Sequence, residues 1–267
     1  MTECLYQFDE PVSPHIAARK KIVSKVPDSI GTELIRAKIP RDDDPLASIH
    51  KTLSAWARTD IDFALVETAG GAHSPAPNGN SQADLYRPLR LPIVLVADSR
   101  LGGISASISA YESLLLRGYD VQSVLLFRDE YYQNHEYLGN FFRKKSIPLV
   151  SLAAPPAKPS QTDANSLARD EEAMTSYYQQ VSQESDIMRL VEDMNVKNTK
   201  RIERLEEMAS RAQDLIWYPF TQHYGMRPKD ITVIDSAHDD YFQTFGTGRT
   251  EKPDSELRPT FDGSASW

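Results

Sequence analysis

Apolar and polar residues follow two alternating periodicities along residues 44–152. Over residues 44–58, apolar side chains fall three and four positions apart, which is typical of one face of an amphipathic helix. The members of this stripe are Leu46, Ile49, Leu53 and Trp56. Residues 61–67 (IDFALVE) then form an apolar run of strand length that ends on a carboxylate. Residues 92–97 (PIVLVA) are almost unbroken in their apolarity, as in a parallel strand that is covered on both faces.

The same alternation continues after residue 97. The pattern predicts a helix over residues 104–117, with Gly118 at its C′ position. A strand over 120–127, a helix over 131–144 and a strand over 147–152 follow. Strands that alternate with helices predict an α/β fold, a parallel sheet with flanking helices.

The pattern changes at Ala153. Residues 153–165 contain three prolines among polar residues and indicate a linker or surface loop. Residues 186–215 predict a long charged helix with Asp186 as its N-cap. Beyond it we expect a strand over 231–234 and then turns to the end. Before residue 41, a short helix is expected around residues 17–19.

Composition narrows the class of protein. Hydrophobic residues make up 40% of the 267 residues and charged residues 25%, which is ordinary for a globular domain. The net charge of −8 argues against a nucleic-acid partner. The single cysteine, Cys4, excludes an internal disulfide framework and favours a reducing compartment. No apolar run has the length of a membrane span, and no secretory signal or transit peptide is evident.

The strongest candidate site is residues 66–71 (VETAGG). A carboxylate at the C-terminal end of a parallel strand lies where open α/β sheets bind ligands, and it suits Mg²⁺. The glycines Gly70 and Gly71 let backbone N–H groups approach an anion closely. Spacing alone leaves open the alternative that Glu67 is a strand end followed by an ordinary glycine turn.

A second candidate is residues 101–106 (LGGISA), which open a helix directly after a buried strand. Unpaired N–H groups and the helix dipole favour an anion there, and Ser105 adds a hydroxyl donor. The alternative is an ordinary strand-to-helix turn in which Ser105 or Ser107 faces solvent.

The remaining motifs are weaker. Of the six histidines, only His15 and His73 lie in loops beside the candidate sites, while His50 is expected to be solvated. The phosphate-loop pattern GxxxxGK[ST] is absent. The nearest sequence, residues 246–250 (GTGRT), lacks the lysine, and no buried strand is expected before it.

Several motifs, in order, carry a resemblance to a known family. Residues 8–19 (FDEPVSPHIAAR), 65–71 (LVETAGG) and 88–103 (PLRLPIVLVADSRLGG) strongly resemble dethiobiotin synthetases. Residues 83–92 (ADLYRPLRLP) are similar to the eukaryotic form, in which that domain is fused ahead of a diaminopelargonic acid aminotransferase.

The end of the chain agrees with this resemblance. Residues 217–223 (WYPFTQH), 232–237 (TVIDSA) and 261–267 (FDGSASW) resemble the opening segments of that aminotransferase. The resemblance therefore implies three parts. They are a partial dethiobiotin synthetase domain of P-loop NTPase-like fold (1–152), a proline-rich linker with a long helix (153–214), and the N-terminal segment of a PLP-dependent aminotransferase (215–267).

The resemblance implies a step of biotin synthesis, the ATP-dependent ring closure of 7,8-diaminopelargonic acid. CO₂ adds to one amine to form a carbamate, ATP phosphorylates the carbamate, and the second amine attacks to close the urea ring. The implied ligands are ATP, Mg²⁺, CO₂ and the diamine, with PLP only in a complete aminotransferase. A homodimer is expected, with no nucleic acid or membrane partner. Relatives of this form imply a mitochondrial or cytoplasmic location.

The resemblance also assigns residues. Glu67 would bind Mg²⁺, and Thr68, Ala69 and Gly70 would lie along the nucleotide phosphates. The substrate would be bound by residues from three segments: Ser13, His15, Gly71, Gly102, Gly103, Ile104 and Ser105. The helix-opening residues among them would hold the substrate carboxylate across the dimer.

The chain departs from the family pattern in ways that affect activity. The phosphate-loop lysine and threonine and the PLP-binding lysine are expected to lie outside residues 1–267, so the isolated chain is expected to be inactive. Thr68 stands where glycine is usual. Two alternatives remain: a non-catalytic dimerisation or binding module, and an unrelated anion-binding α/β domain.

Overall fold

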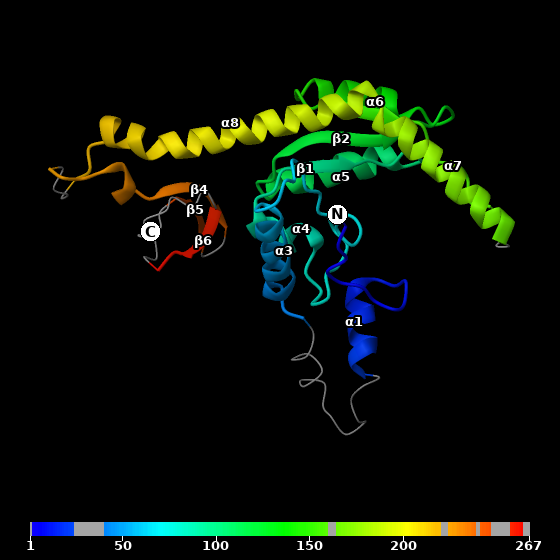
Figure 1. Cartoon of the computed structure of the whole chain (residues 1–267), viewed down its shortest axis with the longest axis horizontal. Helices are drawn as coiled ribbons and strands as arrows, with labels where there is room; N and C mark the ends of the chain where they lie inside the picture. Colours follow the sequence, from blue (N-terminus) through cyan, green and yellow to red (C-terminus); the bar gives the residue numbers. More distant parts are fainter. Residues whose placement is uncertain are drawn as a thin grey trace. The chain divides into compact units, whose positions relative to one another are not determined.

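The computed structural model describes residues 2–23, 40–159, 164–219, 224–238, 241–246 and 257–263. The chain divides into two compact units, residues 1–190 and 191–267, which are considered separately. Figure 1 shows their helices and strands along the sequence.

A three-stranded parallel sheet forms the centre of the first unit. Its strands are β1 (Ile93–Val96), β2 (Val121–Phe127) and β3 (Leu149–Leu152), in the order β1-β2-β3. Helix α5 (Gly103–Leu116) connects β1 to β2, and α6 (Asn134–Arg143) connects β2 to β3. This arrangement confirms the predicted class, an α/β parallel sheet with flanking helices.

The core lies between this sheet and the two connecting helices. Val124 and Leu126 of β2 are almost fully buried, as are Leu138 and Phe142 of α6. The Tyr111 ring of α5 meets the Phe142 ring edge to face, with 5.2 Å between ring centroids. Because apolar area removed from water is the main driving force of folding, this cluster fixes α5 and α6 on the sheet.

Helix α6 begins three residues later than the sequence predicted. Asp129 accepts hydrogen bonds from the backbone N–H groups of Tyr131 and Tyr132, each at 2.9 Å. Gln133 then adopts a left-handed conformation with φ of 50°. An aspartate that binds the following backbone N–H groups favours a turn over a helix, so the helix starts at Asn134.

The strand predicted over residues 61–67 is wrong. These residues have no regular secondary structure and pair with no strand in the described part of the chain. A β-strand exists only through ladder hydrogen bonds to a neighbour, and the sheet pairs β1 with β2 alone. Leu65 is consequently 69% exposed.

Four further elements precede β1 in the first unit. They are α1 (Pro14–Val23), α3 (Asp43–Trp56), α4 (Gln82–Leu85) and the 3₁₀ helix η1 (Arg87–Leu89). α1 confirms the short N-terminal helix, and it begins on a proline because the first turn has no backbone N–H bond to lose. α3 confirms the amphipathic helix, with Ile49 buried and His50 exposed.

Two helices follow β3. α8 (Ser185–Leu215) confirms the predicted long helix, but it starts before Asp186, so Asp186 lies in the first turn and is not the N-cap. α7 (Ala164–Ser182) was not predicted. The hydroxyl of Tyr177 in α7 donates a 2.8 Å hydrogen bond to the carbonyl of Ala153, which anchors this helix near the end of β3.

The second unit contains an antiparallel sheet of β4 (Val233–His238), β5 (Tyr241–Phe245) and β6 (Leu257–Phe261), preceded by the 3₁₀ helix η2 (Pro228–Asp230). Only β4 was predicted, and β5 and β6 were missed. Buried Phe245 of β5 directly precedes Gly246, so the expectation that no buried strand precedes the GTGRT sequence is also wrong. Residues 247–250 of that sequence lie outside the described residues.

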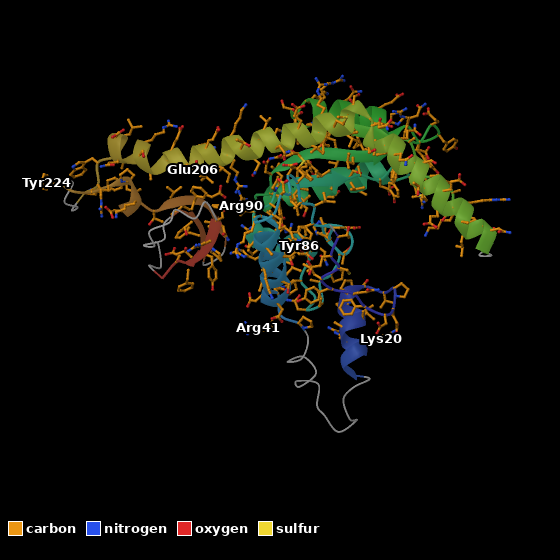
Figure 2. All side chains as sticks on the ribbon, viewed as in Figure 1. Lys20, Arg41, Tyr86, Arg90, Glu206 and Tyr224 are labelled. Carbon is orange, nitrogen blue, oxygen red and sulfur yellow. The ribbon has the colours of Figure 1, made fainter. Side chains whose placement is uncertain are left out.

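Leu205 of α8 forms the small core of this unit with Val233 and Phe245. Arg201 of α8 pairs with buried Asp235 of β4 at 2.9 Å. Figure 2 shows Tyr224, which is fully exposed between α8 and η2.

Candidate functional site

The loop that carries Glu67 is held in shape by its own hydrogen bonds. The Thr68 hydroxyl donates to the Gly70 carbonyl at 2.9 Å, and the Gly70 N–H donates to the Thr68 carbonyl at 2.9 Å. Gly70 has φ of 106°, and a Cβ there would lie 2.6 Å from the Ser74 hydroxyl. A side chain at position 70 is therefore excluded, whereas a Cβ at Gly71 would meet only open space.

Glu67 itself is exposed. No hydrogen bond or ion pair within the described residues uses its carboxylate. An exposed carboxylate beside two glycines is open to a cation or a polar ligand, and its structural role in the fold is small. The alternative of an ordinary strand end is wrong, because residues 61–67 form no strand, and ligand binding by Glu67 stays a prediction.

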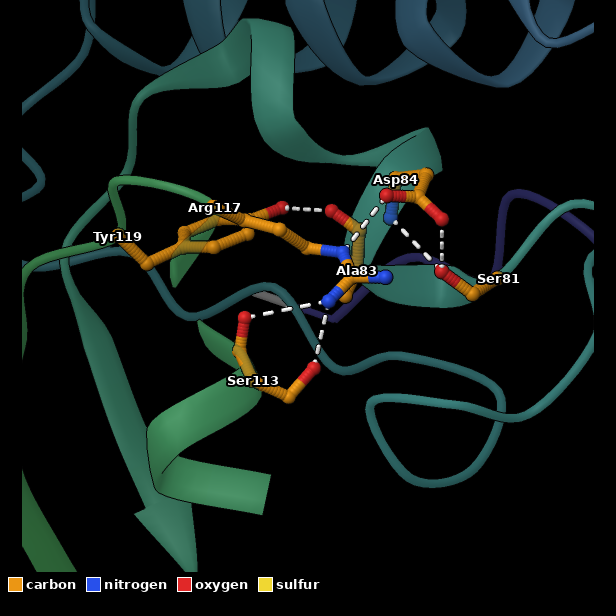
Figure 3. Close-up of polar contacts among 6 residues, drawn as sticks. All are labelled: Ser81, Ala83, Asp84, Ser113, Arg117 and Tyr119. Carbon is orange, nitrogen blue, oxygen red and sulfur yellow. Dashed lines mark hydrogen bonds and ion pairs between the residues drawn. The ribbon is translucent and has the colours of Figure 1, made fainter. Parts of the chain in front are cut away.

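A polar cluster holds α4, the helix after this loop, against the end of α5 and Tyr119 (Figure 3). Arg117, directly after α5, donates to Asp84 of α4 at 2.7 Å and to the Ser113 hydroxyl at 2.6 Å. Ser81 caps α4 by accepting the Asp84 N–H at 3.1 Å. The buried Tyr119 hydroxyl donates to the Ala83 carbonyl at 2.7 Å.

Two of these groups have shifted pKa values. Burial raises the pKa of Tyr119 well above its ordinary value, so its hydroxyl is a donor throughout the neutral range. The hydrogen bond from Arg117, followed by that from Ser81, lowers the pKa of Asp84. The cluster thus links α4, and with it the end of the glycine loop, to α5 and β2. Figure 2 shows Tyr86 and Arg90 on the segment that then leads to β1.

Removing this link is expected to destabilise the first unit. Arg117→Ala should lower the free energy of unfolding by about 1–2 kcal/mol, because it removes three hydrogen bonds at a half-exposed site. Asp84 has a lowered pKa, so the ion pair stabilises the fold above the ordinary carboxyl pKa and is lost as pH falls through the lowered value. The difference in thermal stability between the two proteins should therefore shrink from pH 7 towards pH 3. Arg100→Ala, at an exposed arginine, is the control, and a difference that is independent of pH would contradict the role of the pair.

The second candidate site is the turn between β1 and α5. Gly102 has φ of 85° and precedes the helix as its N-cap. The Gly103 N–H already donates to the Arg100 carbonyl at 2.9 Å, and the Ala106 N–H donates to the Gly102 carbonyl at 3.1 Å. Within the described residues, the N–H groups of Ile104 and Ser105 have no backbone acceptor, so both are donors available to an anion.

The hydrogen bond from Gly103 to Arg100 changes the role expected for Gly103. Its N–H is not available to a ligand, and its residue is buried. A Cβ at Gly103 would lie 2.1 Å from the Asp98 carbonyl oxygen and 2.8 Å from the Asn134 side-chain nitrogen. Glycine is needed here for close packing of the turn. Ser105 is exposed, as the sequence allowed, whereas Ser107 is buried and its hydroxyl accepts the Asp98 N–H at 3.1 Å.

The third predicted segment lies at the start of α1. The Ser13 carbonyl accepts the N–H groups of Ile16 and Ala17 at 2.9 and 3.1 Å, so its backbone caps the helix. The Nδ1 atom of His15 is buried and has no hydrogen-bond partner within the described residues. No hydrogen bond in the described part of the chain joins Ser13 or His15 to the Glu67 loop or to the start of α5.

The described residues contain no group of three or more acidic, histidine or cysteine side chains that could hold a metal ion. Mg²⁺ commonly binds through one or two carboxylates, with water and substrate phosphates completing its shell. The exposed Glu67 carboxylate fits one such ligand. None of the described helices is long and apolar enough to cross a membrane.

Known proteins match this chain in two ways. Residues 5–156 match the AAA domain family. The whole chain is 63% identical to the bifunctional dethiobiotin synthetase/adenosylmethionine-8-amino-7-oxononanoate aminotransferase of Emericella nidulans, of which it covers 32%. It is 36% identical over its whole length to the mitochondrial bifunctional dethiobiotin synthetase/7,8-diamino-pelargonic acid aminotransferase of Arabidopsis thaliana, of which it covers 29%.

A shorter match connects the chain to enzymes with one activity. The ATP-dependent dethiobiotin synthetase of Phenylobacterium zucineum is 43% identical over 77 residues, which are 28% of this chain and 33% of that protein. The chain spans about a third of the length of the bifunctional relatives. The chain thus belongs to the AAA domain family, as a dethiobiotin synthetase-like member that matches part of the bifunctional synthetase/aminotransferases.

Proposed function

We propose that this chain supplies part of a Mg²⁺- and ATP-dependent ligase that converts 7,8-diaminopelargonic acid into dethiobiotin, in the synthesis of biotin. The full-length match to the Emericella nidulans enzyme carries this proposal, since that relative is named for dethiobiotin synthetase activity. The turn before α5 supports it, because it directly follows the C-terminal end of β1, where a parallel sheet of this kind binds its ligands.

In this proposal the Glu67 loop serves the nucleotide. Glu67 would be one ligand of Mg²⁺, and residues 68–70 would lie along the phosphates. The bound ion would neutralise charge on the phosphates as the carbamate is phosphorylated. The chain's own contribution is a rigid loop: the paired bonds between Thr68 and Gly70 fix the backbone that faces the phosphates.

The start of α5 would hold the substrate carboxylate. The donors would be the N–H groups of Ile104 and Ser105, assisted by the positive end of the helix dipole, with Gly102 shaping the approach. Ser13, His15 and Gly71 would lie near the diamine end. The buried and unpartnered Nδ1 of His15 supports a ligand at α1. We propose that the site is shared across a homodimer, which would bring these segments together.

The second unit would belong to the aminotransferase. The functional division would be residues 1–152, 153–214 and 215–267, with the PLP-binding machinery outside this chain. The compact units divide instead within α8, because the helix packs its later turns on the second sheet. We propose a mitochondrial or cytoplasmic location, and the Arabidopsis thaliana relative is a mitochondrial protein.

A hybrid enzyme tests this function. In it, these 267 residues replace the matching segment of the Emericella nidulans bifunctional enzyme. We expect the hybrid to form dethiobiotin from diaminopelargonic acid, CO₂ and Mg-ATP, as measured by product mass. The 267-residue chain alone should form none, because its sequence has no GxxxxGK[ST] loop. A folded hybrid without synthetase activity would favour a non-catalytic binding module, and turnover by the chain alone would contradict the need for that loop.

A further inference from the structure

Asn134, the first residue of α6, is joined to the turn that precedes α5. The residue is only 5% exposed. The amide nitrogen donates to the Asp98 carbonyl at 3.0 Å and to the Arg100 carbonyl at 2.8 Å. Both hydrogens of the amide are therefore used on two backbone groups that lie 34 and 36 residues away in sequence.

Other hydrogen bonds also hold the turn of residues 98–102. The Arg100 carbonyl, which Asn134 binds, also accepts the Gly103 N–H at 2.9 Å. The Ser107 hydroxyl, one turn into α5, accepts the Asp98 N–H at 3.1 Å. Asp98 closes the turn by accepting the Arg100 N–H at 2.9 Å. The path of residues 98–102, and thus the direction in which α5 begins, depends on these bonds.

We propose that Asn134 is a positioning residue for carboxylate binding at the start of α5, an inference that rests on the function proposed above. It touches no substrate in this proposal. By fixing the carbonyls of Asp98 and Arg100, it keeps Gly103 bonded inwards and leaves the N–H groups of Ile104 and Ser105 facing outwards. Small displacements of such donors weaken a charged hydrogen bond steeply, because the bond depends on distance and angle.

Position 134 requires an amide side chain. The two groups opposite Asn134 are both carbonyl oxygens, so the side chain must offer two donors. Aspartate has almost the same shape, but its carboxylate has no donor and would repel both oxygens. Alanine would leave two carbonyls in a poorly hydrated place without their partner.

The experiment uses the hybrid enzyme and two substrates, diaminopelargonic acid and its neutral methyl ester. The wild-type hybrid should prefer the acid in kcat/KM. Asn134→Ala and Asn134→Asp should each lower kcat/KM for the acid about tenfold, as expected from one or two weakened hydrogen bonds. The rate with the ester and the KM for ATP should change little. Asn140→Ala is the matched control, since Asn140 lies exposed on the same helix.

The outcomes distinguish the carboxylate site from the positioning role of Asn134. A wild-type hybrid without preference for the acid overturns the carboxylate site, and with it this role of Asn134. A wild-type preference that persists unchanged in both Asn134 variants overturns the positioning role alone. Should those variants fail to fold, Ser107→Ala alters the same turn from α5. A reduced preference for the acid in Ser107→Ala supports the inference, and an unchanged preference overturns it.

Discussion

Replacement of Glu67 by glutamine in the hybrid enzyme is expected to lower dethiobiotin formation about 100-fold or more at fixed Mg²⁺, since a direct carboxylate ligand contributes several kcal/mol. The physical reason is charge. The amide keeps the size of the side chain but is a much poorer ligand for a hard cation. The measurement is the steady-state rate as a function of Mg²⁺ concentration, and the variant should need far more Mg²⁺ to reach its lower maximum.

Because Glu67 is exposed, its substitution tests Mg²⁺ binding without a change in stability. The Glu67 side chain is exposed and takes part in no ion pair within the described residues, so Glu67→Gln should leave the thermal stability unchanged. Glu112→Gln, an exposed glutamate of α5, serves as the control for a change in surface charge. Unchanged turnover and Mg²⁺ dependence in Glu67→Gln would mean that Glu67 is an exposed loop residue that binds no Mg²⁺.

The elements that could be predicted are those in which the pattern of apolar residues follows their burial. The apolar run at β1 and the helical pattern of α5 predicted the sheet and its crossover helix, because Ile93, Leu95, Ile104 and Ile108 pack against the core. The expectation that this strand is covered on both faces is wrong, since Val96 is 70% exposed. Gly118 was correctly placed beyond the end of α5, since its φ of 77° is a conformation that favours glycine.

The elements that could not be predicted depend on partners far away in the chain. Residues 61–67 have the composition of a strand, but strand formation needs a neighbouring backbone, which no local pattern specifies. β5 and β6 exist because they pair with β4, and the short pattern of Tyr241–Phe245 does not show this. α7 was missed because most of its residues are exposed, which leaves a weak apolar stripe.

The residues of the candidate site also include some that the sequence could indicate and some that it could not. Glu67 and the glycines at positions 70, 102 and 103 could be proposed as site residues from the sequence, because glycine and carboxylate in these patterns have few roles. Asn134 could not be found, since its function depends on two carbonyls of a turn that the sequence places more than 30 residues earlier. Ser107 also appeared as a solvent-facing alternative, although it is buried and binds that turn.

The structure gives Gly103 a role that the sequence did not indicate. The resemblance implied only that it binds the substrate. A Cβ at Gly103 would overlap the Asp98 carbonyl and the Asn134 amide. Any substitution there thus acts on the turn first and on ligand binding only through it.

Gly103→Ala is expected to destabilise the synthetase part of the hybrid by about 3 kcal/mol, the upper range for forcing extra atoms into a packed site. The added Cβ would lie 2.1 Å from the Asp98 carbonyl oxygen, so the turn must move, and the two hydrogen bonds from Asn134 would be strained or lost. The melting temperature should fall by roughly 10 °C, and Gly103→Val should fall further or fail to fold. Gly139→Ala is the matched control, because a Cβ at that position of α6 meets nothing within 4 Å, and alanine is the better helix former. A Gly103→Ala protein as stable as the wild type would mean that the turn accommodates a side chain, and the close packing of residues 98–103 on Asn134 would then be wrong.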